Sequence, residues 1–118
     1  MAKRSDELYL RDLDAIKKIE NYVNGLDYKK FSKNPIVIDA VLRNFEIIGE
    51  ASKNLSKEIK SSYPEIPWKE MAGMRNKVIH EYFGVDLKIV WRTIKKRLPE
   101  LKIKIKKILK NFKFQVEP

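Results

Sequence analysis

The spacing of hydrophobic residues along the chain predicts a protein built from helices. Apolar side chains recur at every third or fourth position, which places them on one face of an α-helix. The first stripe begins after the helix-start signal Ser5, which two acidic residues follow, and it stops at Asn24-Gly25. Its members are Tyr9, Leu13, Ile16, Ile19 and Val23. We therefore expect a first helix from Ser5 to about Val23.

A linker and a long second helix are predicted next. Residues 26–33 have the composition of a linker that contains one helical turn around residues 28–31. Asn34-Pro35 is a capping residue followed by a proline at the first helical position. The stripe that follows consists of Val37, Val41, Phe45, Ile48, Ser52, Leu55 and Ile59. This stripe predicts a second helix that runs to about Lys60.

Prolines mark the boundaries of the third helix. Two prolines in the stretch from Ser61 to Pro67 predict a turn, because proline lacks the amide hydrogen that a helix interior needs. Pro67 can begin a third helix, which we expect to run to His80 or Tyr82. Gly84 then ends it.

The C-terminal segment predicts one or two further helices. Asp86 can cap a fourth helix, and Pro99 then either kinks that helix or begins a fifth. The run LKIKIKKI at residues 101–108 alternates as a strand would, but the surrounding spacing of three and four favours a helix. The residues expected to face inwards are Leu87, Val90, Trp91, Ile94, Leu98, Leu101, Ile105, Ile108 and Phe112. The predicted fold class is therefore all-α, an antiparallel bundle of four to five helices.

Length and composition place this bundle in a broad class. A chain of 118 residues with 43% hydrophobic content suits one domain that spans residues 1–118. The absence of cysteine excludes a disulfide framework, thiolate zinc sites and a thiol nucleophile, and it fits a reducing cytoplasm. No segment reaches the roughly 18 apolar residues of a membrane span, and the N-terminal residues lack an apolar signal core. We expect a cytoplasmic protein with no membrane partner.

The positive charge is concentrated at one end of the chain. The net charge is +10, and between Lys88 and Lys113 eleven Lys or Arg residues accompany a single acid, Glu100. Such a strip attracts a polyanion such as RNA, although a lysine-rich helix can also present a merely solvated face. The residues predicted to bind RNA are Lys95, Lys96, Arg97, Lys102, Lys106 and Lys107.

An arginine occupies the apolar face of the predicted third helix. On a helical wheel Arg75 lies within the arc of Trp68, Met71, Val78, Ile79 and Tyr82. A guanidinium is seldom buried without a partner, so Arg75 requires either an ion pair with the second helix or a position in an interface or cleft. Asn76 and His80 share one edge beside this face. The three polar side chains can therefore converge on one groove.

His80 is the only histidine, which limits the chemistry available to one subunit. A single histidine excludes a metal site built from several histidines and an acid–base pair of two histidines. A lone histidine is often structural. Beside Arg75 and Asn76, however, its imidazole can act as the base for a ribose hydroxyl while the guanidinium holds a phosphate. If the groove lies on a two-fold axis, a homodimer supplies a second copy of each residue.

The second helix carries another face that could be buried. Opposite the core stripe, one arc contains Ile36, Arg43, Ile47 and Glu50. Gly49-Glu50-Ala51 supplies small residues for close helix packing. Either the face is buried, with Glu46 or Glu50 orienting Arg75 or Arg43, or the helix is amphipathic with two stray isoleucines.

The segment Arg75 to Tyr82, RNKVIHEY, resembles the R-x4-H-x-Y signature of the HepT toxins in the HEPN superfamily. Other segments are also similar to that family: RNFEIIGEA at 43–51, residues 68–74, FGVD at 83–86, Trp91 and Leu98-Pro99. The resemblance extends from about Leu8 to Leu109.

The resemblance implies a function. HepT toxins are homodimers with the motif at the subunit interface. They cleave RNA without metal or cofactor, by attack of the ribose 2′-hydroxyl that leaves a 2′,3′-cyclic phosphate. Arg75 and His80 would be the catalytic pair, Asn76 the polar residue beside them, and tRNA or mRNA the substrate. In this toxin–antitoxin pair a minimal nucleotidyltransferase antitoxin silences the toxin by transferring AMP to the motif tyrosine, here Tyr82. Without the family, Tyr82 would equally suit the core.

Two other functions compete with the toxin. One is a non-catalytic HEPN accessory subunit that binds nucleotide or assists a nucleotidyltransferase, which the complete motif argues against. The other is a basic nucleic-acid-binding module, which leaves the apolar setting of Arg75 unexplained. Kinase, polymerase and serine-hydrolase functions lack support, since the sequence contains no glycine-rich phosphate loop, metal-spaced carboxylates or serine triad.

Overall fold

The computed structural model describes the backbone of residues 4–80 and 86–116, and the side chains of residues 6–75 and 86–111. Within these ranges all regular secondary structure is helical, which confirms the all-α prediction.

The N-terminal segment forms two helices where one was predicted. These are α1 (Arg4–Asp12) and α2 (Ala15–Val23). The turn between them uses hydrogen bonds that span three residues, such as that from the Asp14 amide to the Arg11 carbonyl at 3.0 Å. In a straight helix Leu10 and Ile19 would lie on opposite faces. The turn reorients α2 so that both segments bury their apolar residues in one core: Leu10, Leu13, Ala15, Ile16, Ile19 and Val23.

The linker and the start of the second long helix are as predicted. The short α3 (Tyr28–Ser32) is the expected helical turn. The long α4 (Pro35–Asn54) begins at the proline, and the Asn34 side chain accepts a hydrogen bond from the Val37 amide at 3.1 Å. Asn34 therefore caps the helix. The missing backbone N–H of Pro35 costs no hydrogen bond, because an amide at this first position has no partner within the helix.

The predicted end of this helix at Lys60 is wrong. α4 ends at Asn54, and a separate α5 (Lys57–Ser62) follows, with the Ser56 hydroxyl accepting from the Ile59 amide at 3.3 Å. The backbone amide and hydroxyl of Ser56 both donate to the buried carboxylate of Asp6, at 2.8 and 2.7 Å. An acid 50 residues away in the sequence fixes this break, and no local pattern could reveal it.

The third long helix, α6 (Trp68–His80), begins directly after Pro67. Residues 81–85, which include Tyr82 and the predicted stop at Gly84, lie outside the described residues. The chain is described again from Asp86, whose side chain accepts from the Lys88 amide at 2.9 Å and caps α7 (Leu87–Arg92), as predicted.

A π-helical turn, Thr93–Arg97, joins α7 to α8 (Leu98–Val116). Pro99 lies in the first turn of α8, in agreement with the alternative that it begins a fifth helix. The two helices nevertheless stay connected, since the Leu98 amide bonds to the Thr93 carbonyl five residues earlier. A wider turn leaves room for the proline ring, which would otherwise crowd the carbonyl four residues before it. The run at 101–108 is helical, as the spacing favoured.

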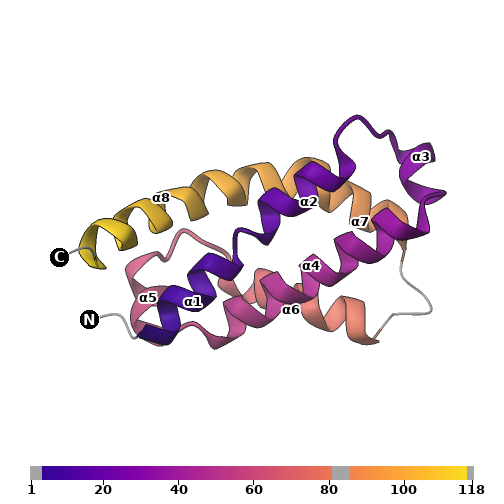
Figure 1. The fold of residues 1–118 in the computed structure, drawn as a ribbon. Helices are drawn as coiled ribbons and strands as arrows, with labels where there is room; N and C mark the ends of the chain where they lie inside the picture. The colour runs from indigo at the N-terminus through magenta and orange to yellow at the C-terminus, as the bar shows by residue number, and fades with distance from the viewer. Residues whose placement is uncertain (1–3, 81–85, 117–118) are drawn as a thin grey trace.

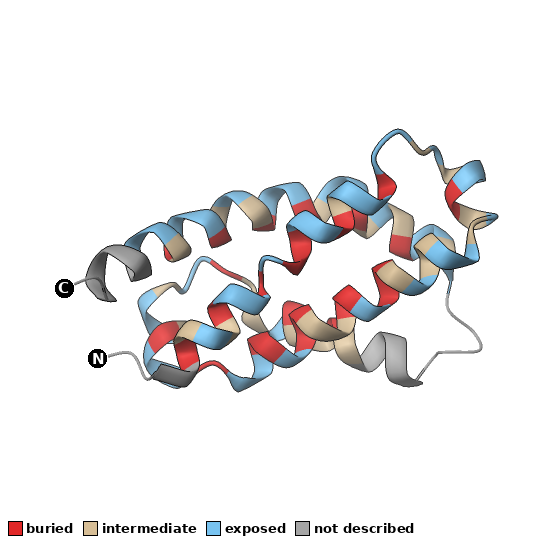
Figure 2. Cartoon of the chain, viewed as in Figure 1, coloured by how far each residue is buried: buried red, intermediate tan, exposed pale blue. Residues whose placement is uncertain are grey.

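The described helices form an antiparallel bundle (Figure 1). α1 and α2 run together in one direction, α4 returns, α6 runs forward again, and α7 with α8 returns along the opposite side. α4 and α6 share the most extensive contact of any pair of elements. Buried residues lie on the inward sides of the helices (Figure 2), and they include Ile48, Met71, Leu98 and Ile108. None of the described helices combines the length and the hydrophobicity that a membrane span requires.

Candidate functional site

The predicted catalytic arginine lies where α6 meets α4. The side chain of Arg75 is 35% exposed, so it borders the core rather than being enclosed by it. Its Nε atom lies 3.9 Å from Oε2 of Glu50 on α4. That distance is an ion pair without a hydrogen bond. Within the described part of the chain, the guanidinium is therefore held loosely by one carboxylate, which leaves its N–H groups open to an anion.

Two acids of α4 pair with different arginines. Glu50 accompanies Arg75, whereas Oε2 of Glu46 lies 3.6 Å from the NH1 atom of Arg43. Of the two acids considered for orienting Arg75, Glu50 is the one that the structure places beside it.

The backbones of α4 and α6 approach closely at Gly49. A Cβ atom placed on this buried glycine would lie 2.5 Å from the Arg75 backbone nitrogen, 2.5 Å from its Cβ and 3.0 Å from its Cα. All three nearest atoms belong to the motif arginine. We call this contact, centred on Gly49 and Arg75, the α4–α6 seam. The sequence suggested that Gly49 permits close packing, but not which residue it contacts.

For the motif residues Asn76 and His80, the structure describes the position of the backbone. Asn76 and His80 both belong to α6, on the same helix as Arg75. At about 1.5 Å per residue, the Cα atoms of Arg75 and His80 are separated by about 7.5 Å along the helix axis. The side chains of Asn76 and His80, and all of Tyr82, lie outside the described residues.

The second face of α4 faces solvent in the single chain. Ile36 is 82% exposed, Arg43 and Glu50 are exposed, and Ile47 is half-buried. Arg75 borders this surface through its contact with Glu50.

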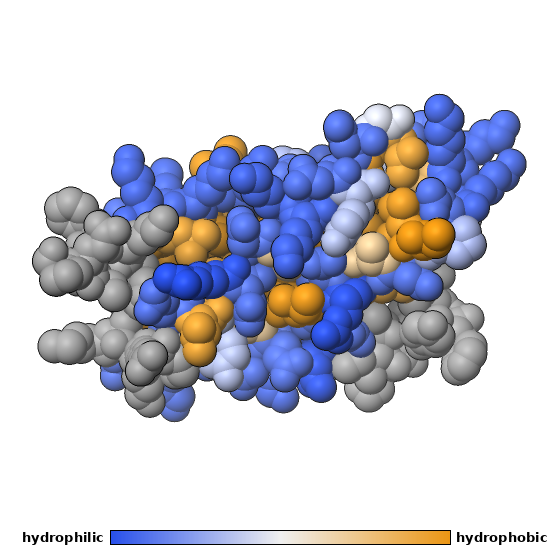
Figure 3. Space-filling view, viewed as in Figure 1, coloured by the Kyte–Doolittle hydropathy of each residue, from blue (hydrophilic) through white to orange (hydrophobic). Residues whose placement is uncertain are grey.

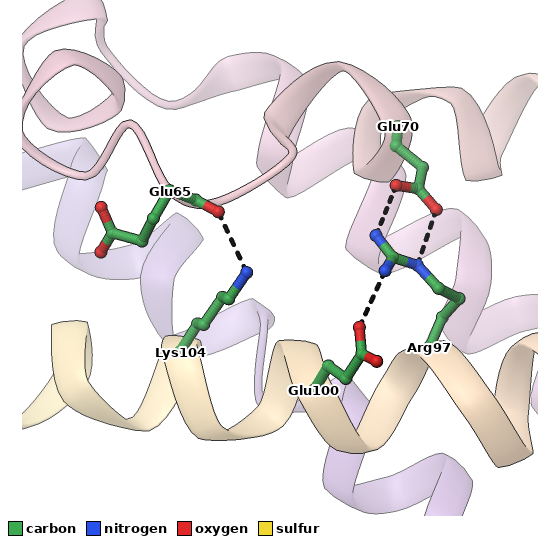
Figure 4. Close-up of polar contacts among 5 residues, drawn as sticks. All are labelled: Glu65, Glu70, Arg97, Glu100 and Lys104. Carbon is green, nitrogen blue, oxygen red and sulfur yellow. Dashed lines mark hydrogen bonds and ion pairs between the residues drawn. The ribbon is translucent and has the colours of Figure 1, made fainter.

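Three of the six residues predicted to bind RNA have partners within the protein. Arg97 bonds to both carboxylate oxygens of Glu70 on α6, at 2.7 and 3.0 Å, and to Glu100 at 2.8 Å (Figure 4). The hydrogen bonds and charge of Glu70 raise the pKa of Arg97 above its ordinary value. Lys102 pairs with Glu20 of α2 at 2.8 Å, and the Lys95 ammonium lies 4.8 Å from the centre of the Trp91 ring.

The other three residues of this set, Lys96, Lys106 and Lys107, are exposed and have no partner among the described residues. Lys104, which lies in the same segment, also has a partner: it donates a hydrogen bond to the Glu65 carbonyl at 3.2 Å, as Figure 4 shows. The basic segment therefore contains both structural cations and solvent-facing cations. Sequence charge alone does not separate them.

A shallow crevice lies on the same side of the bundle. It is open to solvent and lies between the α1–α2 turn and α8. Its lining combines apolar side chains with three lysines and one acid: Leu13, Asp14, Ile16, Lys17, Lys102, Ile105, Lys106 and Leu109. The face seen in Figure 3 is otherwise mostly hydrophilic, with hydrophobic residues in separate patches. Among the described residues no three His, Cys, Asp or Glu side chains are grouped as metal ligands.

Comparison with known proteins places the chain in a family. Residues 13–108 match the family described as ribonuclease HepT-like. A protein of Caldanaerobacter subterraneus subsp. tengcongensis, whose name proposes RNase activity, is 50% identical over 77% of this chain and 81% of its own length. A Thermococcus cleftensis protein named "Probable ribonuclease HepT" is 47% identical over 92% of this chain and 99% of its own. No solved structure shows significant similarity to the chain.

Proposed function

The chain belongs to the HepT-like ribonuclease family of the HEPN superfamily, and on that premise we propose that it is a metal-independent endoribonuclease and the toxin of a toxin–antitoxin pair. The observation that carries the proposal is the setting of Arg75. Its partly exposed side chain has a single ion pair among the described residues, at 3.9 Å, and belongs to an intact R-x4-H-x-Y motif.

The proposed chemistry needs few groups. Arg75 holds the scissile phosphate with paired N–H donors and stabilises the charge that develops on it. His80 removes the proton from the ribose 2′-hydroxyl, and the oxygen attacks the adjacent phosphorus. The bond from phosphorus to the 5′-oxygen breaks, and the leaving oxygen takes up a proton from water. The products are a 2′,3′-cyclic phosphate and a 5′-hydroxyl. Asn76 supports the groove as a polar neighbour.

The site is proposed to be composite, formed by two copies of the chain. Each chain has one histidine, and a two-fold axis beside α4 and α6 would bring a second Arg75 and His80 to the groove. The exposed Ile36 and the half-buried Ile47 support this surface as the contact. A monomer at micromolar concentration in light scattering would contradict it.

Control of the toxin is proposed to act at Tyr82. A minimal nucleotidyltransferase partner would transfer AMP to its hydroxyl, with pyrophosphate leaving from ATP. The added phosphate would neutralise Arg75 and obstruct the groove.

The experiment is RNA cleavage by the purified protein in excess EDTA, beside Arg75→Ala and His80→Ala. We expect cleavage by the unaltered protein, cyclic-phosphate ends, and at least a roughly 100-fold loss in each variant with helicity and dimerisation retained. Retained cleavage in either folded variant would favour the accessory-subunit alternative. Loss of cleavage in EDTA that returns with a divalent cation would remove metal independence.

A further inference from the structure

The α4–α6 seam assigns a role to a residue outside the motif. We propose that Gly49 is a positioning residue, whose missing side chain sets the depth at which Arg75 enters the groove. The inference rests on the proposed function, because it concerns how the catalytic arginine is placed.

The contact at Gly49 leaves no freedom for adjustment by side-chain rotation. The atoms that a Cβ would meet are the backbone nitrogen, Cα and Cβ of Arg75. None of these can rotate away, unlike the end of a flexible side chain. To restore an ordinary contact, the shortest distance must lengthen from 2.5 Å to at least 3.4 Å. Any side chain at position 49 therefore shifts α6 by nearly an ångström at Arg75.

The neighbouring residue holds the other end of the arginine. Successive residues of a helix project about 100° apart, so Gly49 can face the α6 backbone while Glu50 projects from the flank of α4. Glu50 lies beside the Arg75 guanidinium at 3.9 Å. Gly49 thus fixes the position of the Arg75 backbone, and Glu50 lies beside the guanidinium at the end of the Arg75 side chain.

A shift of α6 would affect the reaction more than RNA binding. Misplacing a catalytic group by about 1 Å can cost on the order of 100-fold in rate. Affinity for RNA would change less, because the solvent-facing Lys96, Lys106 and Lys107 belong to the π-turn and α8, outside the two helices of the seam. A lost contact that operates only in the transition state lowers kcat and kcat/KM together, with KM little changed.

The chain contains a matched control for this substitution. Gly73 lies on α6, two residues before Arg75, and a Cβ placed on it meets nothing within 4 Å. Gly73→Ala makes the same chemical change as Gly49→Ala without the collision.

The first measurement is single-turnover and steady-state cleavage of a short mixed-sequence RNA. We expect Gly49→Ala to lower kcat by about 100-fold with little change in KM, while Gly73→Ala stays within about twofold of the unaltered protein. A Gly49→Ala protein that cleaves at the normal rate would overturn the inference and leave the proposed function intact. An unaltered protein that does not cleave would instead remove the proposed function.

The second measurement separates positioning from general packing and needs no cleavage. The probe is the all-deoxy counterpart of the same oligonucleotide, which retains phosphates but lacks the attacking hydroxyl. We expect Gly49→Ala and Arg75→Ala each to weaken its binding by no more than about threefold, far less than they lower kcat, and the double variant to bind no more weakly than Arg75→Ala alone. Additive losses would show that Gly49 does not act through Arg75. If Gly49→Ala lowers the folded fraction, both measurements are made in a Gly73→Ala background, where the added helix propensity offsets the loss.

Discussion

The α4–α6 seam and the exposed face of α8 are built in opposite ways. At the seam, two helices touch through their backbones at Gly49 and Arg75. On the described part of α8, a buried row that includes Leu98, Leu101, Ile105 and Ile108 anchors the helix, while Lys106 and Lys107 project into solvent. A new side chain at the seam must move a helix, whereas a change on the exposed face removes only that side chain. We therefore expect steep effects at the seam and graded effects on α8.

Truncation of a buried isoleucine should destabilise the protein most, and it can be compared in the two regions. Ile48 on α4 and Ile108 on α8 are both fully buried. Truncating a buried isoleucine to alanine costs about 2–5 kcal/mol, depending on how far the surroundings can relax. We expect Ile48→Ala near the upper end of that range, because α4 is enclosed by α2 and α6, and Ile108→Ala near the lower end. Denaturant unfolding of both variants measures the difference, and equal losses would mean that α8 is packed as rigidly as α4.

The next effect concerns the stability of the two glycine variants. Gly49→Ala overpacks the seam, for which a cost of about 1–3 kcal/mol is expected, less the gain of up to about 1 kcal/mol that alanine brings to a helix. Gly73→Ala should bring that gain alone, since its Cβ meets open space. Thermal unfolding should therefore shift in opposite directions. A stabilised Gly49→Ala protein would show that α6 moves away from α4 at little cost.

The fold was largely predictable because helix boundaries depend on local signals. Caps and prolines correctly located the starts of α4, α6 and α7. The errors arose where tertiary contacts override local pattern. The break after α4 depends on the carboxylate of Asp6, and the α1–α2 turn places Leu10 in the common core. The spacing of apolar residues along a helix does not reveal either of these tertiary contacts.

The candidate site was predictable in its residue types but not in its supports. The motif and its basic surroundings are visible in the sequence, and so is an acid of α4 as a partner for Arg75. The close approach of Gly49 to one particular residue requires the packing angle of two helices. The ion pair between Arg97 and Glu70 could be predicted only if the π-turn that carries Arg97 were already known. The roles of Arg75 and His80 are tested by their substitution with alanine.

A smaller effect is expected from the cations that face solvent. Phosphate contacts release counterions, so each lost contact lowers the slope of log affinity against log salt by about 0.7 for single-stranded RNA. Lys96, Lys106 and Lys107 have no described partner, whereas Lys95, Arg97 and Lys102 do. Replacing the first three by Gln should therefore flatten the slope more than replacing the second three. Binding titrations over a salt series measure this, with single-turnover rates at saturating RNA little changed. Equal slopes for both triple variants would remove the distinction between structural and solvent-facing cations.

The smallest effect tests the link between the two regions. Arg97 joins the α7–α8 segment to α6 through Glu70, five residues before Arg75, and its guanidinium also bonds to Glu100. These side chains are 39, 48 and 60% exposed, so solvent screens the charges and we expect Arg97→Gln to cost only about 0.5–1 kcal/mol. The loss should shrink at high salt, because mobile ions weaken the same ion pairs in the unaltered protein.

Glu70→Gln is the matched variant, since it removes the α6 carboxylate but leaves Arg97 bonded to Glu100. If the link matters through Glu70, the two substitutions should cost similar amounts in unfolding measurements, and the double variant should cost little more than either. An Arg97→Gln loss well above that of Glu70→Gln would place the stabilisation within α8 instead, and the seam and the basic face would then be mechanically independent.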